Sequence, residues 1–593
     1  MNTGIKDCQN CHLKFTIEPD DFAFYEKVKV PPPTFCPRCR SIRRGLWRNE
    51  RHLYHRKCAA LGHSETLISM YAPDDPVTVC DTKFWWGDAW DPMSYGRDYD
   101  FSRSFWEQFS ELQKVVPRPP LVNNKAVDSD YCNFCDGNKN CYLVVNGNRN
   151  EDCAYTALTV DSKNVFDGLW CAKSEFAYEC IDCDSCYHTA YAERCEACVE
   201  SAFLFDCRGL TNCLFCVGLR NASYHAFNKP VAPEEYKRFL AELGGSYKKY
   251  VEAIAKFEEM KLRFPRRSNL FTGSKGVSGE NILNSNAVKH GFDIFNSEHC
   301  AYVEEGLKGK DCYDTVYFDG AELCYESSST IGYNYLFTLF CRDSKELQYC
   351  DNCHASSHLF GCVGLRSKQY CILNKQYSKE EYETLVPKIR AHMDEMPYVS
   401  QRANGKEQII YKYGEFFPAE LSPFAYNETV AQEFYPTTKD SAERQGFRWN
   451  APDTKNYAIT KAPEALPDSI GTADDALLGE TIGCAHHGSC AHECTVAFRL
   501  IPHELQFYRR MNLPLPRLCP NCRYYGRLAK RNPLQFSRRA CQCAGLKSEN
   551  GIYANTGTHT HKDSPCPNEF ETPYSPDRPE IVYCEECYKA EVF

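Results

Sequence analysis

The chain has 593 residues, a formal net charge of -10 and a pI near 6.0. A chain of this length is too long for one hydrophobic core, so we expect several domains. The acidic balance excludes a protein that is basic over its whole surface and coats nucleic acid indiscriminately. Any basic function must therefore be local.

Cysteine is unusually common, at 37 residues. The first residues, MNTGIKDCQN, lack the pattern of a secretory signal, and no apolar run approaches the length needed to span a membrane. We therefore expect a cytoplasmic protein without membrane contact. In a reducing compartment, clustered cysteines are typical metal ligands and scattered cysteines are typical small core residues.

The two ends of the chain are copies of one module. Residues 15–58 align without a gap with residues 498–541. The shared positions include Phe24 and Tyr25 with Phe507 and Tyr508, Cys36 and Cys39 with Cys519 and Cys522, Arg48 and Asn49 with Arg531 and Asn532, and Cys58 with Cys541.

Each copy carries a candidate zinc site. In the N-terminal copy, two CxxC pairs supply four thiolates that can close a tetrahedron around Zn²⁺. In the C-terminal copy, three residues rather than two separate the members of the first pair. The predicted ligands are Cys8, Cys11, Cys36 and Cys39 in the first copy and Cys490, Cys494, Cys519 and Cys522 in the second. The alternative is a pair of turns that binds nothing.

A third site is predicted beyond the C-terminal copy, which brings the expectation to about three Zn²⁺ per chain. We favour Cys541, Cys566, Cys584 and Cys587 as its ligands, with Cys543 and the histidines His559 and His561 as competing sources. The N-terminal copy keeps only Cys58 and Cys80 of this set, so its site is lost or completed by His55 or His63. The roles of Cys484 and Cys543 stay open.

The stretch CQNCHLKFTIEPDDFAFYEKVKVPPPTFCPRCRSIRR combines a CxxC, the segment FYEK, several prolines and a closing CPxCR. With these motifs it resembles the bacterial "probable zinc-ribbon" family. The resemblance covers only the two ends and implies a zinc-ribbon or treble-clef fold with no established activity. The C-terminal copy departs from the pattern at its first pair. The whole arrangement also resembles uncharacterised zinc-ribbon proteins of small-genome uncultivated bacteria, which supplies no function.

The middle of the chain is also duplicated, because residues 214–243 match residues 360–389. Each copy closes a stretch in which short strand-like segments recur with a period of about 11 residues, separated by Asn, Asp, Gly or Ser. This pattern predicts two β-solenoid (β-helix-like) blocks whose cysteines form a ladder of core thiols. The alternatives for these cysteines are metal binding between coils, above all at 180–198 and 350–353, and disulfides.

The predicted fold class is therefore mainly β with added helices: two cysteine-rich β-solenoid blocks flanked by duplicated zinc-ribbon modules. An interrupted helix is expected after the first block, with its break at Gly244 and Gly245, and a helix capped by Ser378 after the second. The predicted division is 1–125 (ribbon module with aromatic extension), 126–229 (first solenoid), 230–280 (helical), 281–376 (second solenoid), 377–397 (helix), 398–483 (mixed segment and linker) and 484–593 (second ribbon module).

Two islands of positive charge lie beside the predicted zinc sites. Arginine presents a planar fork that suits phosphate, and neighbouring aromatic residues could stack on unpaired bases. The predicted nucleic-acid-binding residues are Arg40, Arg43, Arg44 and Arg48 at one end and Arg523, Arg527, Lys530 and Arg531 at the other. The equally weighted alternative is that these side chains pair with acidic groups of the solenoids or lie near the negatively charged zinc sites.

Three functions compete. The first is a non-enzymatic zinc-binding scaffold that docks RNA or a ribonucleoprotein through its arginines. The second is a protein-protein interaction scaffold whose arginines face an acidic partner. The third, an enzyme acting on carbohydrate or through zinc, is disfavoured because all-cysteine zinc sites leave no coordination position open for water. The partner and the oligomeric state do not follow from the sequence.

Overall fold

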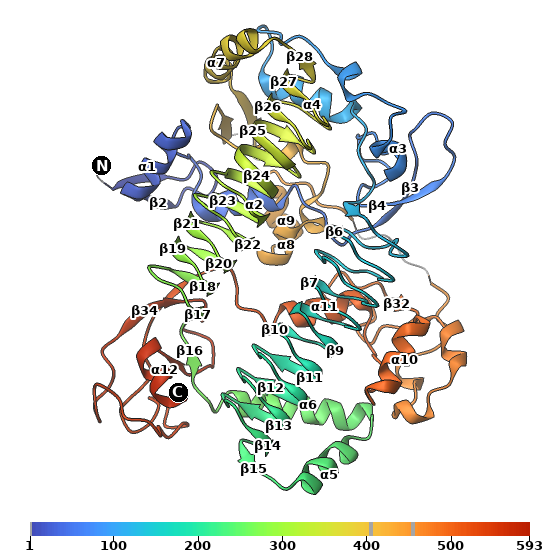
Figure 1. Ribbon diagram of the computed structural model, residues 1–593, viewed down its shortest axis with the longest axis vertical. Coiled ribbons are helices and arrows are strands. Elements are labelled where there is room, and N and C mark those ends of the chain that lie inside the picture. The colour runs from blue at the N-terminus through green and yellow to red at the C-terminus, as the bar shows by residue number, and fades with distance from the viewer. Residues whose placement is uncertain (1–2, 403–406, 452–456, 593) are drawn as a thin grey trace. The chain divides into compact units, whose positions relative to one another are not determined.

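The computed structural model describes residues 3–402, 407–451 and 457–592. Strands predominate and several helices are present (Figure 1), so the mainly β class with added helices is confirmed. The chain divides into two compact units. Unit 1 comprises Met1–Leu121 and Asn269–Ala451, and unit 2 comprises Val122–Ser268 and Pro452–Phe593. Each unit thus contains one of the duplicated ends and one of the duplicated repeat blocks.

The repeat block of unit 2 forms a sheet in which each strand pairs in parallel with the segment twelve residues further on. Tyr187 pairs with Val199, and Ala202 pairs with Leu214. The step is therefore 12 residues rather than the expected period of about 11. Its strands are β5 (Asn123–Asn124), β6 (Cys135–Asp136), β7 (Ala157–Val160), β8 (Leu169–Ala172), β9 (Glu175–Tyr178), β10 (Ile181–Asp184), β11 (Tyr187–Glu193), β12 (Val199–Phe205), β13 (Thr211–Val217), β14 (Ser223–Ala226) and the antiparallel β15 (Lys229–Pro230).

The repeat block of unit 1 is built in the same way. Tyr313 pairs with Tyr325, and Leu336 pairs with Gln348, again twelve residues apart. Its strands are β17 (Phe271–Thr272), β18 (Gly279–Leu283), β19 (Asn286–Lys289), β20 (Gly291–Phe295), β21 (Glu298–Ala301), β22 (Glu304–Leu307), β23 (Tyr313–Asp319), β24 (Tyr325–Leu339), β25 (Arg342–Asp351), β26 (Ser357–Phe360), β27 (Gln369–Ile372) and the antiparallel β28 (Lys375–Gln376).

Asn and Asp recur between the strands because the backbone turns there through the left-handed region. Asn140, Asp152 and Asn164 lie twelve residues apart, with φ of 52°, 54° and 54°. Short polar side chains tolerate this conformation better than β-branched ones. The punctuation seen in the sequence therefore marks the corners at which successive strands are connected.

Thiols and hydroxyls are stacked in the interior of each block, and both kinds of group donate hydrogen bonds to backbone carbonyls. The Cys198 sulfur donates to the carbonyls of Glu196 and Cys207, at 3.5 and 3.7 Å. The Thr189 hydroxyl donates to the carbonyls of Tyr187 and Cys198 in the same pattern, at 2.9 and 3.2 Å. Cysteine thus fills the interior and also donates a weak hydrogen bond to the chain on either side.

Helices follow each sheet. α5 (Pro233–Leu243) and α6 (Tyr247–Lys261) occupy the stretch that predicted an interrupted helix, and they are separated at Gly244 and Gly245, which have φ of 53° and 65°. α7 (Lys379–Glu395) begins at a capping box in which the Ser378 hydroxyl accepts the Glu381 N–H. α5 packs beside β13 and β14, and α7 packs beside β27 (Figure 1). Each helix thus lies against strands close to the end of its sheet, where the short antiparallel strands β15 and β28 form the last pair.

The terminal module of unit 1 consists of short strands and helices, completed by elements from the end of the unit. These elements are β1 (Gly4–Asp7), β2 (Lys14–Ile17), α1 (Pro19–Val28), α2 (Pro37–Gly45), β3 (Tyr54–Lys57), β4 (Thr66–Ser69), α3 (Thr82–Trp86), η1 (Pro92–Tyr95) and α4 (Phe105–Val115), followed after α7 by β29 (Tyr398–Gln401), β30 (Gln408–Tyr411), η2 (Ala419–Leu421), η3 (Tyr426–Glu428), α8 (Val430–Phe434) and α9 (Lys439–Arg444).

The terminal module of unit 2 repeats the same core of two helices, each beginning with a proline. Its elements are β16 (Arg266–Arg267), η4 (Pro463–Ala465), η5 (Ile470–Thr472), η6 (Asp475–Gly479), β31 (Ile482–Gly483), β32 (Ala497–Phe498), α10 (Pro502–Arg510), α11 (Pro520–Leu528), β33 (Ser537–Ala540), β34 (Glu569–Thr572), β35 (Val582–Tyr583) and α12 (Glu585–Val592). α10 corresponds to α1, and α11 corresponds to α2.

Each module packs against the repeat block of its own unit through equivalent aromatic residues. In unit 1 the Phe24 ring stacks on Tyr313, with ring centroids 3.9 Å apart. In unit 2 the Phe507 ring stacks on Phe166 at 4.4 Å. The N-terminal module therefore packs on the second repeat block, and the C-terminal module packs on the first.

The aromatic segment before the first block also belongs to unit 1. The sequence predicted it as an extension of the ribbon module. Phe105 and Trp106 of α4 contact Tyr349 of β25, with centroids 5.3 and 5.2 Å apart, and Trp85 of α3 contacts His354 at 5.8 Å. The segment is thus part of the packing of the second block.

The segment expected to be an acidic linker is packed into unit 2. Leu466, Ile470 and Leu477 are buried in the core that also contains α10. The predicted segment 398–483 includes residues 403–406 and 452–456, which lie outside the described residues.

A pair of substitutions at Cys362 tests the role of the interior thiols. This fully buried sulfur donates to the carbonyls of Phe360 and Cys371, at 3.5 and 3.4 Å. Cys362→Ser keeps both hydrogen bonds, so we expect it to lower the free energy of unfolding by about 1 kcal/mol or less. Cys362→Leu overpacks the column and should cost about 1–3 kcal/mol. Urea denaturation followed by circular dichroism measures both; a larger loss for Ser than for Leu would show that the thiol acts only as apolar filling.

Candidate metal centres

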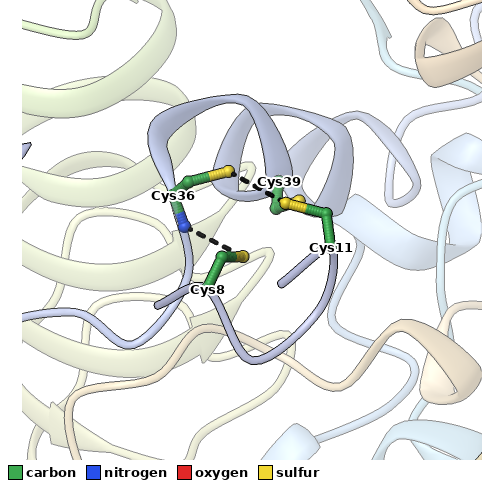
Figure 2. A group of neighbouring side chains, drawn as sticks. All are labelled: Cys8, Cys11, Cys36 and Cys39. Atoms are coloured by element: carbon green, nitrogen blue, oxygen red, sulfur yellow. Dashed lines mark hydrogen bonds between the residues drawn. The ribbon is translucent and has the colours of Figure 1, made fainter. Parts of the chain in front are cut away.

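The N-terminal group brings together the four predicted cysteines, Cys8, Cys11, Cys36 and Cys39 (Figure 2). Cys8 and Cys11 lie at the turn between β1 and β2, while Cys36 is the N-cap of α2 and Cys39 lies in its first turn. The Cys36 N–H donates to the Cys8 sulfur at 3.2 Å. The start of a helix favours thiolate because its free N–H groups and its dipole attract negative charge.

The sulfur–sulfur distances fit a tetrahedral ion. A Zn²⁺ with four Zn–S bonds of about 2.3 Å gives sulfur–sulfur edges of about 3.8 Å. The sulfurs of Cys11 and Cys36 are 3.7 Å apart, much farther than a disulfide bond of about 2 Å allows. The four thiols are therefore already placed as a metal ion would require.

Charge repulsion within this group also favours a cation. Hydrogen bonds from Cys36 and Cys39 lower the pKa of the Cys8 thiol far below its usual value. The hydrogen bond with Cys39 lowers the pKa of Cys36, but the hydrogen bond that Cys36 gives to Cys8, burial and the charge of Cys8 outweigh it and raise that pKa to about 12. A divalent ion among the sulfurs would stabilise all four as thiolates.

The second four-cysteine group contains Cys484, which the sequence had left without a role. Cys484, Cys494, Cys519 and Cys522 lie within ligand distance of one another. The Cys519 N–H donates to the Cys484 sulfur at 3.3 Å, as the Cys36 N–H donates to the Cys8 sulfur at 3.2 Å. Cys484 is therefore the counterpart of Cys8, and the predicted Cys490 lies in a different group, with His486, His492 and Cys522.

Sequence reasoning missed Cys484 because the chain between the members of the first pair is longer in unit 2. Two residues separate Cys8 from Cys11, but nine separate Cys484 from Cys494. A gapless alignment places Ala491 opposite Cys8 and hides the match. The available signal was that Cys484 directly follows an apolar strand, β31, as Cys8 follows β1.

The third four-cysteine group is the predicted one: Cys541, Cys566, Cys584 and Cys587. The pair Cys584 and Cys587 lies at the start of α12, and the Cys584 N–H donates to the Cys541 sulfur at 3.1 Å. The sulfurs of Cys566 and Cys584 are 3.9 Å apart. All three groups thus use one construction, in which a CxxC at a helix start meets a thiol from a preceding turn. The competing histidines His559 and His561 form a neighbouring group with Cys543 and Cys587.

The remaining N-terminal cysteines lie together. The Cys58 sulfur accepts the Asp81 N–H at 3.3 Å. Burial and the nearby Cys58 raise the pKa of Cys80 to about 12. His63 instead pairs with Glu65, at 2.6 Å.

The arginines predicted to bind nucleic acid are directed into the protein. In unit 1, Arg40 contacts Asp314 at 2.9 Å, and Arg44 contacts both Asp314 and Glu326 at 3.1 Å. Arg43 contacts Glu326 at 2.7 Å, and Arg48 pairs with Glu50. These four arginines are at most 3% exposed.

The equivalent residues of unit 2 also contact acidic side chains of their repeat block. Arg523 and Arg527 contact Asp167 at 2.6 and 2.9 Å, and Lys530 contacts Glu193 at 3.0 Å. Arg523 and Arg527 are buried, whereas Lys530 and Arg531 are half-buried. The sequence left two alternatives open, and the contacts favour pairing with acidic side chains of the repeat block. The six buried arginines are not available to RNA at the surface.

These pairs are strongly coupled. Burial alone would lower the pKa of Arg40, but the Asp314 carboxylate outweighs it and raises that pKa well above its usual value. Burial likewise opposes ionisation of Glu193, yet the ammonium groups of Lys530 and Lys261 lower its pKa to about 2. Arg40 and Glu193 are therefore both charged over the physiological pH range.

Comparison of the chain with protein-family models and with curated proteins gave no match. The resemblance of the two ends to zinc ribbons thus stays a prediction from their motifs. Among the helices of the described residues, none is both long enough and apolar enough to cross a membrane.

Asp167 provides a test of the module–block contact. It is fully buried and pairs with both Arg523 and Arg527, so Asp167→Ala removes the carboxylate that these two buried cations share, while Arg523 keeps its pair with Glu504. We expect a loss of about 3–5 kcal/mol in the free energy of unfolding of unit 2. The control is Asp161→Ala, which removes an exposed pair with Arg149 and should cost less than about 1 kcal/mol. Equal losses in urea denaturation would contradict a structural role for the buried pair.

Two substitutions distinguish Cys484 from Cys490. Cys484→Ser removes one thiolate of the four-cysteine group and should weaken thiolate-to-cobalt absorption and destabilise the C-terminal module, because metal binding at such sites contributes directly to folding. Cys490→Ser should leave the four-thiolate ion in place. The measurement is the ultraviolet spectrum and melting temperature of the cobalt-substituted protein; the reverse ranking would restore the ligand set predicted from the sequence.

Proposed function

We propose that the protein is a non-enzymatic zinc-binding scaffold, in which zinc ribbons are fixed to β-solenoid blocks. The carrying observation is that each four-cysteine group lies at the start of a helix, and that two of these helices, α2 and α11, carry arginines buried against the repeat block. A tetrahedral ion with four thiolates has no position for water or substrate. The zinc would therefore act on structure, through the position of α2 and α11.

Between the two kinds of partner, the contacts support protein rather than RNA. The RNA hypothesis depended on exposed arginine forks, and six of these arginines are buried in ion pairs. Phosphate contacts need cations that remain accessible to the nucleic acid. The interaction-scaffold alternative does not depend on them, and the cytoplasmic location remains part of the proposal.

A hollow in unit 2 suggests where a partner would bind. It has a volume of about 250 Å³ and is lined by acidic and tyrosine side chains, among them Asp128, Asp130, Asp152, Tyr131 and Tyr142. The rings of Tyr131 and Tyr142 meet edge to face at 5.3 Å. Carboxylates beside aromatic faces suit a lysine or arginine side chain. We therefore propose a basic protein segment as the partner, in place of the acidic partner that exposed arginines would have required.

Binding of two probes tests this proposal. A fluorescent oligolysine peptide should bind the zinc-loaded full-length protein, and a single-stranded RNA of the same charge number should not. The double substitution Asp130→Asn with Asp152→Asn should weaken peptide binding about tenfold, which corresponds to about 1.4 kcal/mol.

The control carries the same change of charge outside the hollow, at Asp161→Asn with Asp184→Asn, and should weaken binding much less. Fluorescence anisotropy measures all three proteins. Equal weakening would show that the peptide senses only the net charge. Tight, salt-sensitive RNA binding would reinstate the RNA hypothesis.

A further inference from the structure

Two groups of histidine and cysteine lie directly beside the four-cysteine groups of unit 2, and each shares one cysteine with its neighbour. His486, Cys490 and His492 gather around Cys522, which also belongs to the group with Cys484. Cys543, His559 and His561 gather in the same way around Cys587, which also belongs to the group with Cys541. In both pairs the shared residue is the second cysteine of the CxxC at a helix start.

The hydrogen bonds of His559 prepare it to bind a metal ion. Its Nε2 lies 2.7 Å from the Glu591 carboxylate, and its Nδ1 lies 3.7 Å from the Cys543 sulfur. The carboxylate accepts further hydrogen bonds from the N–H of Thr556 and of Gly557, at 2.8 and 3.2 Å, and from the hydroxyls of Thr556 and Tyr553, both at 3.0 Å. A fixed carboxylate that holds the proton on Nε2 leaves the Nδ1 lone pair directed at the cluster, which is the usual support of a metal-bound histidine.

His561 is prepared through its other nitrogen. Its Nδ1 lies 2.6 Å from the Ser564 carbonyl, which can only accept, so the proton is on Nδ1. Its Nε2 lone pair then faces the Cys587 sulfur at 3.2 Å. Two histidines thus present lone pairs to the same space, each with its remaining N–H bound to an acceptor.

In the group around Cys522, the indication of a metal site comes from buried histidine nitrogens. Within the described residues, the Nδ1 atoms of His486 and His492 are buried without a hydrogen-bond partner. Buried polar atoms of this kind are normally satisfied, so they point to a ligand. The sulfurs of Cys490 and Cys522 are 3.5 Å apart, close to the edge of a tetrahedral site.

The extra ligands come from the residues that distinguish unit 2 from unit 1. His486, Cys490 and His492 lie in the nine-residue loop between Cys484 and Cys494, where the N-terminal copy has only two residues. The longer loop therefore supplies three additional side chains that could bind a metal ion.

We propose that each of these two clusters holds two metal ions joined by one thiolate, Cys522 in one and Cys587 in the other. The first ion has four thiolates, and the second has two thiolates and two neutral imidazoles, so both are tetrahedral. Sharing one thiolate leaves each cluster with five thiolates and two divalent ions and hence a net charge of -1, compared with -2 for one ion and four thiolates. This inference rests on the proposed zinc binding by the four-cysteine groups.

Metal stoichiometry provides the first test. The full-length protein is loaded with zinc, desalted and analysed by native mass spectrometry. The double substitutions His559→Ala with His561→Ala, and His486→Ala with His492→Ala, should each remove one zinc, and all four together should remove two. His487→Ala is the matched control, since this exposed histidine lies beside His486 outside the group, and it should remove none.

Cobalt provides the second test, because it reports the bridge itself. Two Co²⁺ ions joined by a thiolate couple their spins, so the electron paramagnetic resonance signal per cobalt should fall as the second position fills. The signal should recover in part in each double-histidine variant and in full when all four histidines are replaced. A full complement of cobalt without coupling would overturn the shared thiolate.

The failures of the two proposals are distinguishable. If the histidine variants keep the wild-type zinc count, each cluster holds a single ion; the inference fails and the zinc scaffold stands. If the protein binds no zinc, both fail.

Discussion

The contact on which the fold depends is the buried ion pair between a helix of the terminal module and a carboxylate of the repeat block. Asp314 holds Arg40 and Arg44 in unit 1, and Asp167 holds Arg523 and Arg527 in unit 2. Removing charges from water is costly, and this cost is recovered only when the geometry is close and the charges remain paired. Such a contact therefore tolerates little displacement, and it selects one orientation of the module on the sheet.

The metal groups explain how that orientation is maintained. The helix that begins with the CxxC carries the arginines one and two turns later, so an ion bound at its start also fixes the direction of the guanidinium groups. The aromatic stacking of Phe24 on Tyr313 and of Phe507 on Phe166 holds the preceding helix. The aromatic packing thus holds the first helix of each module and the ion pairs hold the second, where a metal ion bound by the cysteines would also act.

Local chemistry could be predicted from the sequence, whereas contacts between distant segments could not. The ligands Cys8, Cys11, Cys36 and Cys39, the site at Cys541 and the helix break at Gly244 all depend on short spacings, which a single sequence displays. The acidic partners of the arginines could not be predicted, because they lie hundreds of residues away in the sequence. Asp167 lies at a bend and Asp314 lies in β23, and nothing in their sequence neighbourhood indicates that they would be buried against a module.

The length of the repeat could have been predicted more closely than it was. Averaging the spacing of all strand-like segments suggested a period of about 11 residues. The backbone pairing has a step of 12, and the same step is present in the sequence, where Cys300, Cys312 and Cys324 are each twelve residues apart, as are Tyr191, Phe203 and Phe215. Residues that occupy equivalent places in successive turns therefore report the period, whereas an average over all segments does not.

The order of segments along the chain has a consequence for how the units form. Unit 1 combines the first module with the second repeat block, and unit 2 combines the first block with the last module, so each unit is interrupted by part of the other. The entropic cost of closing such long loops rises only slowly with their length, so this order is compatible with stability. It does delay completion, because neither buried arginine cluster can form until the chain has returned from a distant segment. Until then Asp167 has no contact with Arg523 and Arg527. A metal ion bound by Cys519 and Cys522, at the start of the helix that carries both arginines, would place these arginines for the contact.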